Sequence, residues 1–228
     1  MNKENIIFGL LIIVFAVACT KGKPEKQETQ TPHSNTIDLV ATLDTIWSTE
    51  QEPIRKRDAM LDKYGADSDE FEKYQVIYKA NHIINEQKII AILAGGWPDK
   101  EMIGANGNRT ICNVLQHSDY EIRVKYLPLM QQAVMEEQLS AAFLVRTEDR
   151  LATDRREPQI YGGQMKYYPE TKSFNVWPVY DPINIDKRRA NIGLVPIAEH
   201  LKNRFDFEWN LEEQIKRTEA FEAKRKNK

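Results

Sequence analysis

The stretch LSAAFLVRTEDRLAT, residues 139–153, decides the fold class together with the segment that follows it. Its apolar residues recur at spacings of three and four, which is typical of an amphipathic helix. The next segment, QIYGGQMKYYPETKSFNVWPV, residues 159–179, is rich in Tyr, Phe, Val and Trp and is divided by Pro169–Lys172. This composition predicts a β-hairpin. We therefore expect a mainly α (α+β) protein, a helical domain with one β-hairpin inserted before the C-terminal helices.

Helical patterns surround this pair of segments on both sides. A helical period starts at Ile37, and a second helix is expected from Asp67, where Asp67 and Glu70 have the spacing of a capping box. Its apolar content is Phe71, Tyr74, Ile77, Ile84 and residues 89–93. Further helices are expected at residues 110–117, 121–137, 139–153, 184–191 and 196–205. The pattern predicts one domain over residues 37–206, and a charged, loosely attached helix over residues 207–228.

The first residues have the parts of a secretory signal. Lys3 precedes the apolar run Ile6–Val17, which is shorter than the ~20 residues needed to cross a bilayer. Small residues and then Cys19 follow, in a pattern that resembles the lipobox of bacterial lipoproteins, with Ala16 where Leu is usual. The resemblance implies that residues 1–18 are removed and that Cys19 carries lipid. The alternative is an ordinary secretory signal with an incidental cysteine.

Composition limits the partners and the location. Residues 19–36 are mostly polar and are expected to form a flexible tether from the lipid to the domain. Lys and Arg number 32 against 34 Asp and Glu, so the chain lacks the basic excess of nucleic-acid-binding proteins. We expect a cell-envelope protein attached to a membrane through Cys19. In enteric bacteria the residue after the lipidated cysteine sorts lipoproteins between the two membranes. Under this rule Thr20, in place of Asp, favours the outer membrane. With Cys19 lipidated, Cys112 has no partner for an internal disulfide.

Two adjacent charges in the 139–153 helix are the strongest candidates for a site. On a helical wheel Arg150 falls between Leu139 and Phe143, and Asp149 lies among apolar residues as well. A buried charge costs several kcal/mol unless it is paired and hydrogen-bonded. The two charges are therefore interpreted either as a structural ion pair or as part of a functional site.

Three other segments carry candidate residues. Gln116-His117-Ser118-Asp119 places a histidine at a helix end, where Asn113, four residues earlier, can fix its tautomer. Gln159–Gln164 contains two glycines, which inside a strand indicate a bulge or a close approach by backbone or ligand. Asp186–Arg189 is a charge run at the start of a short helix. For each segment a purely structural or solvated role is the alternative.

These segments, taken in order, resemble those of a known family. They include Glu50-Gln51 with Arg55, Gly96-Trp97-Pro98, Gln116–Asp119, Leu127-Pro128-Leu129, Asp149-Arg150, Gln159–Gln164, Asp181-Pro182, Asp186–Arg189 and Gly193-Leu194 with Pro196. The string resembles the DUF6624 family, a group of uncharacterised bacterial proteins, many of them lipoproteins of Bacteroidetes. Glu50 stands where that family tends to have Asp, and Gly163 where it tends to have Thr. The resemblance supports the expected fold and the lipid anchor and implies no particular activity.

Two hypotheses for function follow. In the first, the domain binds a small polar or anionic ligand, or an envelope protein, since arginine suits carboxylates and phosphates. The expected contact residues are Gln116, Asp119, Gln159, Tyr161, Gln164, Arg150, Arg188 and Arg189. In the second, the protein is a hydrolase. His117 is then the general base for water, oriented by Asn113, Asp119 or Asp149, and Arg150 stabilises developing negative charge. No metal or cofactor is predicted, because the chain lacks metal-binding, phosphate-loop and nucleophile-elbow motifs.

The lipid anchor can be tested directly with Cys19→Ser. This substitution removes the only sulfur at the expected cleavage point, so labelling by a clickable fatty acid should be lost. The protein should also leave the membrane fraction in a cell fractionation. Ser118→Ala, far from the signal, is the control and should be labelled normally. Fatty-acid labelling that persists in the Cys19→Ser protein would exclude this anchor.

Overall fold

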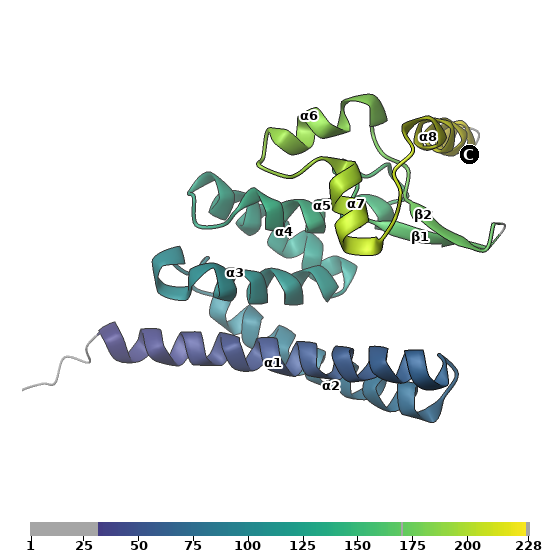
Figure 1. The fold of residues 1–228 in the computed structure, drawn as a ribbon. Coiled ribbons are helices and arrows are strands. Elements are labelled where there is room, and N and C mark those ends of the chain that lie inside the picture. The colour runs from purple at the N-terminus through teal and green to yellow at the C-terminus, as the bar shows by residue number, and fades with distance from the viewer. Residues whose placement is uncertain (1–31, 170, 227–228) are drawn as a thin grey trace, which may run out of the picture. The chain divides into compact units, whose positions relative to one another are not determined.

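The computed structural model describes residues 32–169 and 171–226. This part of the chain contains eight α-helices, a 3-10 helix and one antiparallel hairpin (Figure 1). The helices are α1 (Pro32–Tyr64), α2 (Asp69–Leu93), α3 (Lys100–His117), α4 (Tyr120–Met135), α5 (Ala141–Asp154), η1 (Pro182–Asn184), α6 (Ile185–Ala190), α7 (Ile197–Phe205) and α8 (Leu211–Lys226). The strands are β1 (Met165–Tyr168) and β2 (Ser173–Val176). The predicted fold class, mainly α with a hairpin before the C-terminal helices, is confirmed.

Helices α1–α5 form the larger apolar core. Helices α1 and α2 lie side by side, and α3 packs against both of them (Figure 1). The side chains of Ile46, Ile89 and Ile111 are fully buried where these helices meet, and Met130 of α4 joins the same cluster. Cys112 is buried in it too. None of the helices in residues 32–169 and 171–226 has an apolar stretch sufficient to span a bilayer.

A second, smaller apolar cluster holds the region after α5. It consists of Val176, Val179, Ile185, Ile197 and Leu201, from β2, the segment after it, α6 and α7. Gly162 packs closely on this cluster, because a Cβ there would lie 2.7 Å from the Cδ1 of Ile197, and its φ of 81° is left-handed. Glycine is therefore required at this position by both space and backbone conformation. The cluster fixes the 159–164 segment against α7.

Several predicted boundaries differ from the structure. The cap of α2 is Ser68, whose side chain accepts the Phe71 N–H, and not Asp67. Helix α3 begins at Lys100, ten residues before the predicted start, with a kink at Gly104 (φ 62°). The hairpin is shorter than predicted and pairs Met165 with Val176. Residues 160–164 lie outside it because the amides of Ile160, Tyr161, Gly163 and Gln164 bond to side chains.

The prediction that the C-terminal helix is loosely attached is wrong. Gln214 of α8 is fully buried, and its amide donates to the Trp177 carbonyl over 3.2 Å. The Thr218 hydroxyl bonds the backbone N–H and carbonyl of Val179, and the ring of Phe221 lies 5.3 Å from that of Trp177. These contacts are mainly polar, so the periodicity of apolar residues in α8 could not predict them.

The polar attachment of α8 leads to a prediction about stability. Gln214→Ala should lower the free energy of unfolding by about 1–3 kcal/mol, because it removes a buried donor and leaves a small void. Lys216→Ala on the exposed side of the same helix should change it by less than about 0.5 kcal/mol. Urea denaturation followed by circular dichroism measures both. Equal effects of the two substitutions would show that Gln214 does not hold α8.

Candidate functional site

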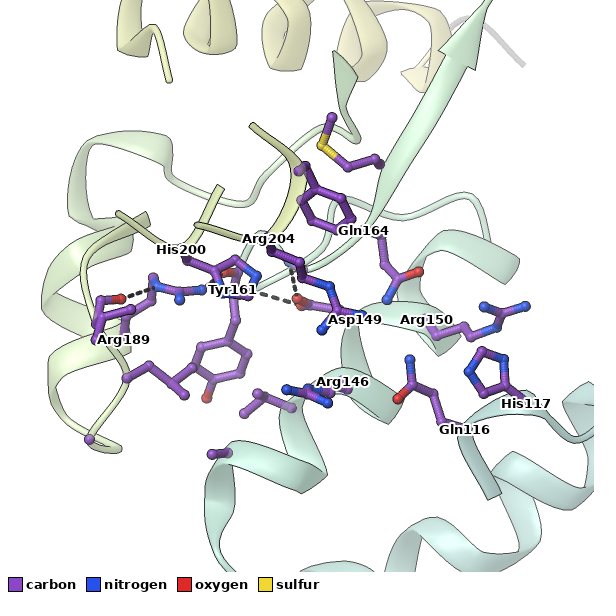
Figure 2. A pocket seen from close by; sticks show the side chains of 18 residues that line it. Gln116, His117, Arg146, Asp149, Arg150, Tyr161, Gln164, Arg189, His200 and Arg204 are labelled. Atoms are coloured by element: carbon purple, nitrogen blue, oxygen red, sulfur yellow. Dashed lines mark hydrogen bonds between the residues drawn. The ribbon is translucent and has the colours of Figure 1, made fainter. Parts of the chain in front are cut away.

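A pocket of about 420 Å³ lies between α5, the 161–165 segment and α7. Figure 2 shows Arg189 and His200 at one end and Gln116, His117 and Arg150 at the other, with Arg146, Arg204, Asp149 and Tyr161 between them. Its lining residues are Gln116, His117, Ala142, Val145, Arg146, Asp149, Arg150, Tyr161, Gly163, Gln164, Met165, Arg189, Gly193, Leu194, Val195, His200, Arg204 and Phe205. Four arginines and two histidines thus surround a single carboxylate.

Asp149 is the buried carboxylate at the centre of this arrangement. Its Oδ1 accepts the backbone N–H groups of Ile160 and Tyr161, and its Oδ2 accepts that of Gly163, each over 2.8 Å. The side chain is 1% exposed. Burial raises the pKa of Asp149 to about 6, while the three amide hydrogen bonds act in the opposite direction. At neutral pH Asp149 is therefore an ionised carboxylate that the loop has already hydrogen-bonded.

The structural ion pair between Asp149 and Arg150, one of the two interpretations of these charges, is not formed. In the described part of the chain the Arg150 side chain forms no hydrogen bond or salt bridge, and its buried Nε is without a partner. Burial and the neighbouring charge of Arg123 lower the pKa of Arg150. Adjacent residues on a helix point in directions about 100° apart, so their side chains diverge. The helical wheel of residues 139–153 correctly placed both charges among apolar residues. It could not show that backbone amides bind Asp149.

Arg146 and Arg204 are the other two unpaired guanidiniums of the pocket. Within residues 32–169 and 171–226 neither has a hydrogen bond or a salt bridge; Arg204 lies over the ring of Phe205. Burial, and then the charge of Arg204, lower the pKa of Arg146. An arginine remains protonated in proteins, so these charges repel one another across the pocket. No carboxylate of the pocket lining compensates them, because Asp149 is bonded to the loop.

Arg189 differs from the other arginines because it is bonded to backbone. Its Nε donates to the Val195 carbonyl over 2.7 Å, and its Nη1 to the Tyr161 carbonyl over 2.5 Å. The same residue is buried. Arg189 thereby joins the 161 segment to the loop before α7, and it adds positive charge to the pocket while holding its wall.

The two histidines of the pocket are neutral near pH 7. Burial, and then the charges of Arg189, Arg204 and Arg146, lower the pKa of His200 to about 4. Burial and the charge of Arg150 lower that of His117 to about 4, although its side chain still reaches solvent at the pocket rim. In both cases the surrounding arginines disfavour a further positive charge. Neutral imidazoles can donate or accept hydrogen bonds to a ligand.

Seven of the predicted site residues line the pocket, and three do not. Those that line it are Gln116, His117, Asp149, Arg150, Tyr161, Gln164 and Arg189. Gln159 is buried behind it and bonds the backbone N–H and carbonyl of Gln164. Arg188 donates to the carbonyls of Ile160, Tyr180 and Asp181, and Asp119 is exposed at the N-terminus of α4. Gln159 and Arg188 therefore hold the backbone of the segments beside the pocket, and Asp119 lies outside the pocket.

The structure adds three residues that sequence reasoning missed: Arg146, His200 and Arg204. Their spacing was an available signal, since Arg146 precedes Arg150 by four residues and His200 precedes Arg204 by four. Residues at this spacing share a helix face. However, nothing in the sequence shows that these faces of α5 and α7 meet across a cavity.

A second polar cluster, also missed, lies between α1 and α2. The fully buried Glu50 accepts from His82 Nδ1 over 3.1 Å and from the Asn85 amide over 3.0 Å. Burial disfavours the charged ring, but the hydrogen bond and charge of Glu50 raise the pKa of His82 overall. His82 Nε2 has no partner in the described residues. Across the part of the chain that the structure describes, no three His, Cys, Asp or Glu side chains converge as metal ligands would.

Fold and site together define a mainly α domain with a hairpin-supported, arginine-lined pocket. The chain belongs to the DUF6624 family, described as a family of unknown function, whose sequence model matches residues 49–209. This range covers the pocket and ends just before α8. No curated protein and no solved structure matches the chain.

The hydrogen bonds of Asp149 lead to a prediction about the site's stability. Asp149→Asn should lower the free energy of unfolding by about 1–3 kcal/mol, since the new side-chain N–H group must face a backbone N–H. Glu148→Gln, the adjacent and half-buried position, makes the same charge change and should cost less than about 0.5 kcal/mol. Urea denaturation at pH 7 compares them. If Asp149→Asn were as stable as wild type, the three amide bonds would not support the loop.

Proposed function

We propose that the protein is a cell-envelope lipoprotein whose domain binds a small anionic ligand, bearing carboxylate or phosphate groups, in the arginine-lined pocket. The proposal rests mainly on the following observation. Three guanidiniums, those of Arg146, Arg150 and Arg204, line one cavity without an acidic partner in the described residues. Arg150 is half-buried, whereas Arg146 and Arg204 are exposed. Like charges held around one cavity repel one another, and an anion would offset that repulsion.

The chemistry of the lining supports an anion with several oxygens. Guanidinium groups form paired hydrogen bonds to carboxylates and phosphates. Gln116, Gln164 and the Tyr161 hydroxyl add neutral hydrogen-bonding groups, and the low pKa values of His117 and His200 leave their rings available as well. Arginines lie at both ends and in the middle of the cavity (Figure 2). A ligand with two separated anionic groups therefore fits better than a single small ion.

Membrane attachment is part of the same proposal and rests on the sequence. Residues 1–18 have the pattern of a signal and Cys19 follows at the cleavage point, but these residues lie outside the described part of the chain. Attachment through lipid at Cys19 would place the pocket in the cell envelope, on the outer membrane under the sorting rule. The partners would then be envelope solutes or proteins. Nothing in the composition suggests nucleic acid.

A hydrolase remains the second candidate because His117 and Arg150 lie next to each other at one end of the pocket (Figure 2). A neutral His117 can accept a proton from water, and Arg150 can stabilise an oxyanion. Two features weigh against it. A pKa near 4 makes His117 a weak base at pH 7, and in the described chain no hydrogen bond links its ring to Asn113, Asp119 or Asp149. Binding is therefore the better-supported function.

Ligand binding can be tested with pyrophosphate and citrate as probes, which carry several anionic groups. Both should raise the thermal midpoint of the wild-type protein, and the effect should weaken with added salt. Arg146→Gln with Arg204→Gln should weaken binding by about tenfold or more in isothermal titration calorimetry, since charged hydrogen bonds are worth ~1.5–3 kcal/mol each. Arg55→Gln with Lys88→Gln, at exposed positions of α1 and α2 outside the pocket, also removes two positive charges and is the charge-matched control.

Three outcomes are distinguished by this experiment. Binding lost in the pocket variant but kept in the control supports the proposal. If neither probe binds, or if the pocket variant and the control lose affinity equally, the pocket is not the anion site. If wild type converts pyrophosphate to phosphate and His117→Gln binds it without turnover, the hydrolase hypothesis replaces simple binding.

A further inference from the structure

Helix α2 exposes a row of large apolar side chains on the side facing away from the core. Val76 is 54% exposed, Ile83 61% and Ile84 52%, and Ile77 is 37% exposed beside them. Ile89 and Leu93 of the same helix are the residues that pack inside the domain. Isolated exposed apolar residues are ordinary, whereas four on one helix face mark an interaction surface.

The spacing of this row is that of a two-heptad coiled-coil seam. Val76, Ala80, Ile83 and Gln87 follow one another at intervals of four, three and four, and all four are exposed. This is the alternation of a and d positions that packs one helix against another. Ile77 and Ile84 follow Val76 and Ile83 at e positions and widen the apolar face. The surface therefore fits a helix with the same seam.

We infer that this α2 surface binds α2 of a second copy of the chain, in an antiparallel pair. A two-fold axis between residues 81 and 82 would place Ala80 against Ile83 of the partner subunit. It would also place Ile77 near Ile84 of the partner subunit, so that apolar or small groups meet at the centre, and Val76 would meet the longer side chain of Gln87 of the partner subunit at each end. The central Ala80 allows the two helices to approach closely.

Charges beside the seam favour this orientation. In an antiparallel pair the g positions face each other, so Lys79 meets Glu86 of the partner subunit, and symmetry makes the contact twice. Neither side chain has a salt bridge or hydrogen bond among the described residues, so both are free for it. In a parallel pair Lys79 would instead face Ile84 of the partner subunit, without charge compensation. The charge pattern thus favours α2 of a second copy of the chain, bound in the antiparallel orientation.

Charge reversal in the protein as it is extracted from membranes and purified in detergent tests the pair by sedimentation velocity. Wild type should self-associate, and Ile83→Glu should be monomeric. Lys79→Glu or Glu86→Lys alone should weaken association by about tenfold, because two attractive contacts become repulsive. The double variant should restore it. Lys88→Glu, an exposed lysine of α2 outside the seam, is the control and should associate like wild type.

The results distinguish antiparallel pairing through α2 from its alternatives. A wild-type chain that is monomeric at its highest soluble concentration overturns it, whether the surface is then free or covered by residues 1–31. A double variant that stays as weak as the single variants overturns the antiparallel register. Circular dichroism melting of every variant separates loss of association from loss of folding. Because α2 contributes no residue to the pocket lining, the result does not depend on whether the pocket binds anions.

Discussion

Asp149 connects α5 to the segment that follows it by accepting three backbone N–H groups. The amides of Ile160, Tyr161 and Gly163 all point at one buried carboxylate, which is a geometry that a continuous strand cannot adopt. Residues 159–164 therefore leave the hairpin and form one wall of the pocket. Gln159 closes the same segment by bonding both backbone groups of Gln164. A change in the loop would leave the carboxylate buried without partners, so the two parts are stable only together.

The same interaction determines the electrostatics of the pocket. A free carboxylate at position 149 could have neutralised one of the arginines, but its oxygens are bonded to the loop. Arg146 and Arg150 lie four residues apart on the same helix and therefore face the same cavity without compensation. The low pKa values of His117 and His200 are a consequence of these charges and of burial. Positive charge, neutral imidazoles and a rigid wall thus arise from one arrangement.

The sequence predicted those parts of the structure that depend on local pattern. Apolar periodicity located the helices, and the Tyr- and Val-rich segment located the hairpin, because each depends on neighbours within a few residues. It also placed Asp149 and Arg150 among apolar residues. It did not predict the partners of Asp149, which lie 11 to 14 residues further along the chain, nor the meeting of α5 with α7 that brings Arg204 to Arg146. Attachment of α8 through Gln214 was missed for the same reason, since a polar contact between distant segments leaves no periodic signal.

Helix α5 relates the stability of the domain to the function proposed for it. One side of this helix, with Leu144, packs into the larger apolar core, and another presents Arg146 and Arg150 to the pocket. The apolar packing holds like charges near one another, where they would otherwise separate. Repulsion between these like charges is therefore a consequence of the packing, reduced by solvent at the exposed Arg146. Groups that oppose folding in this way are characteristic of binding sites, where the ligand supplies the missing charge. The buried Glu50–His82 pair between α1 and α2 shows the contrasting solution within the same chain, because there the charge is compensated internally.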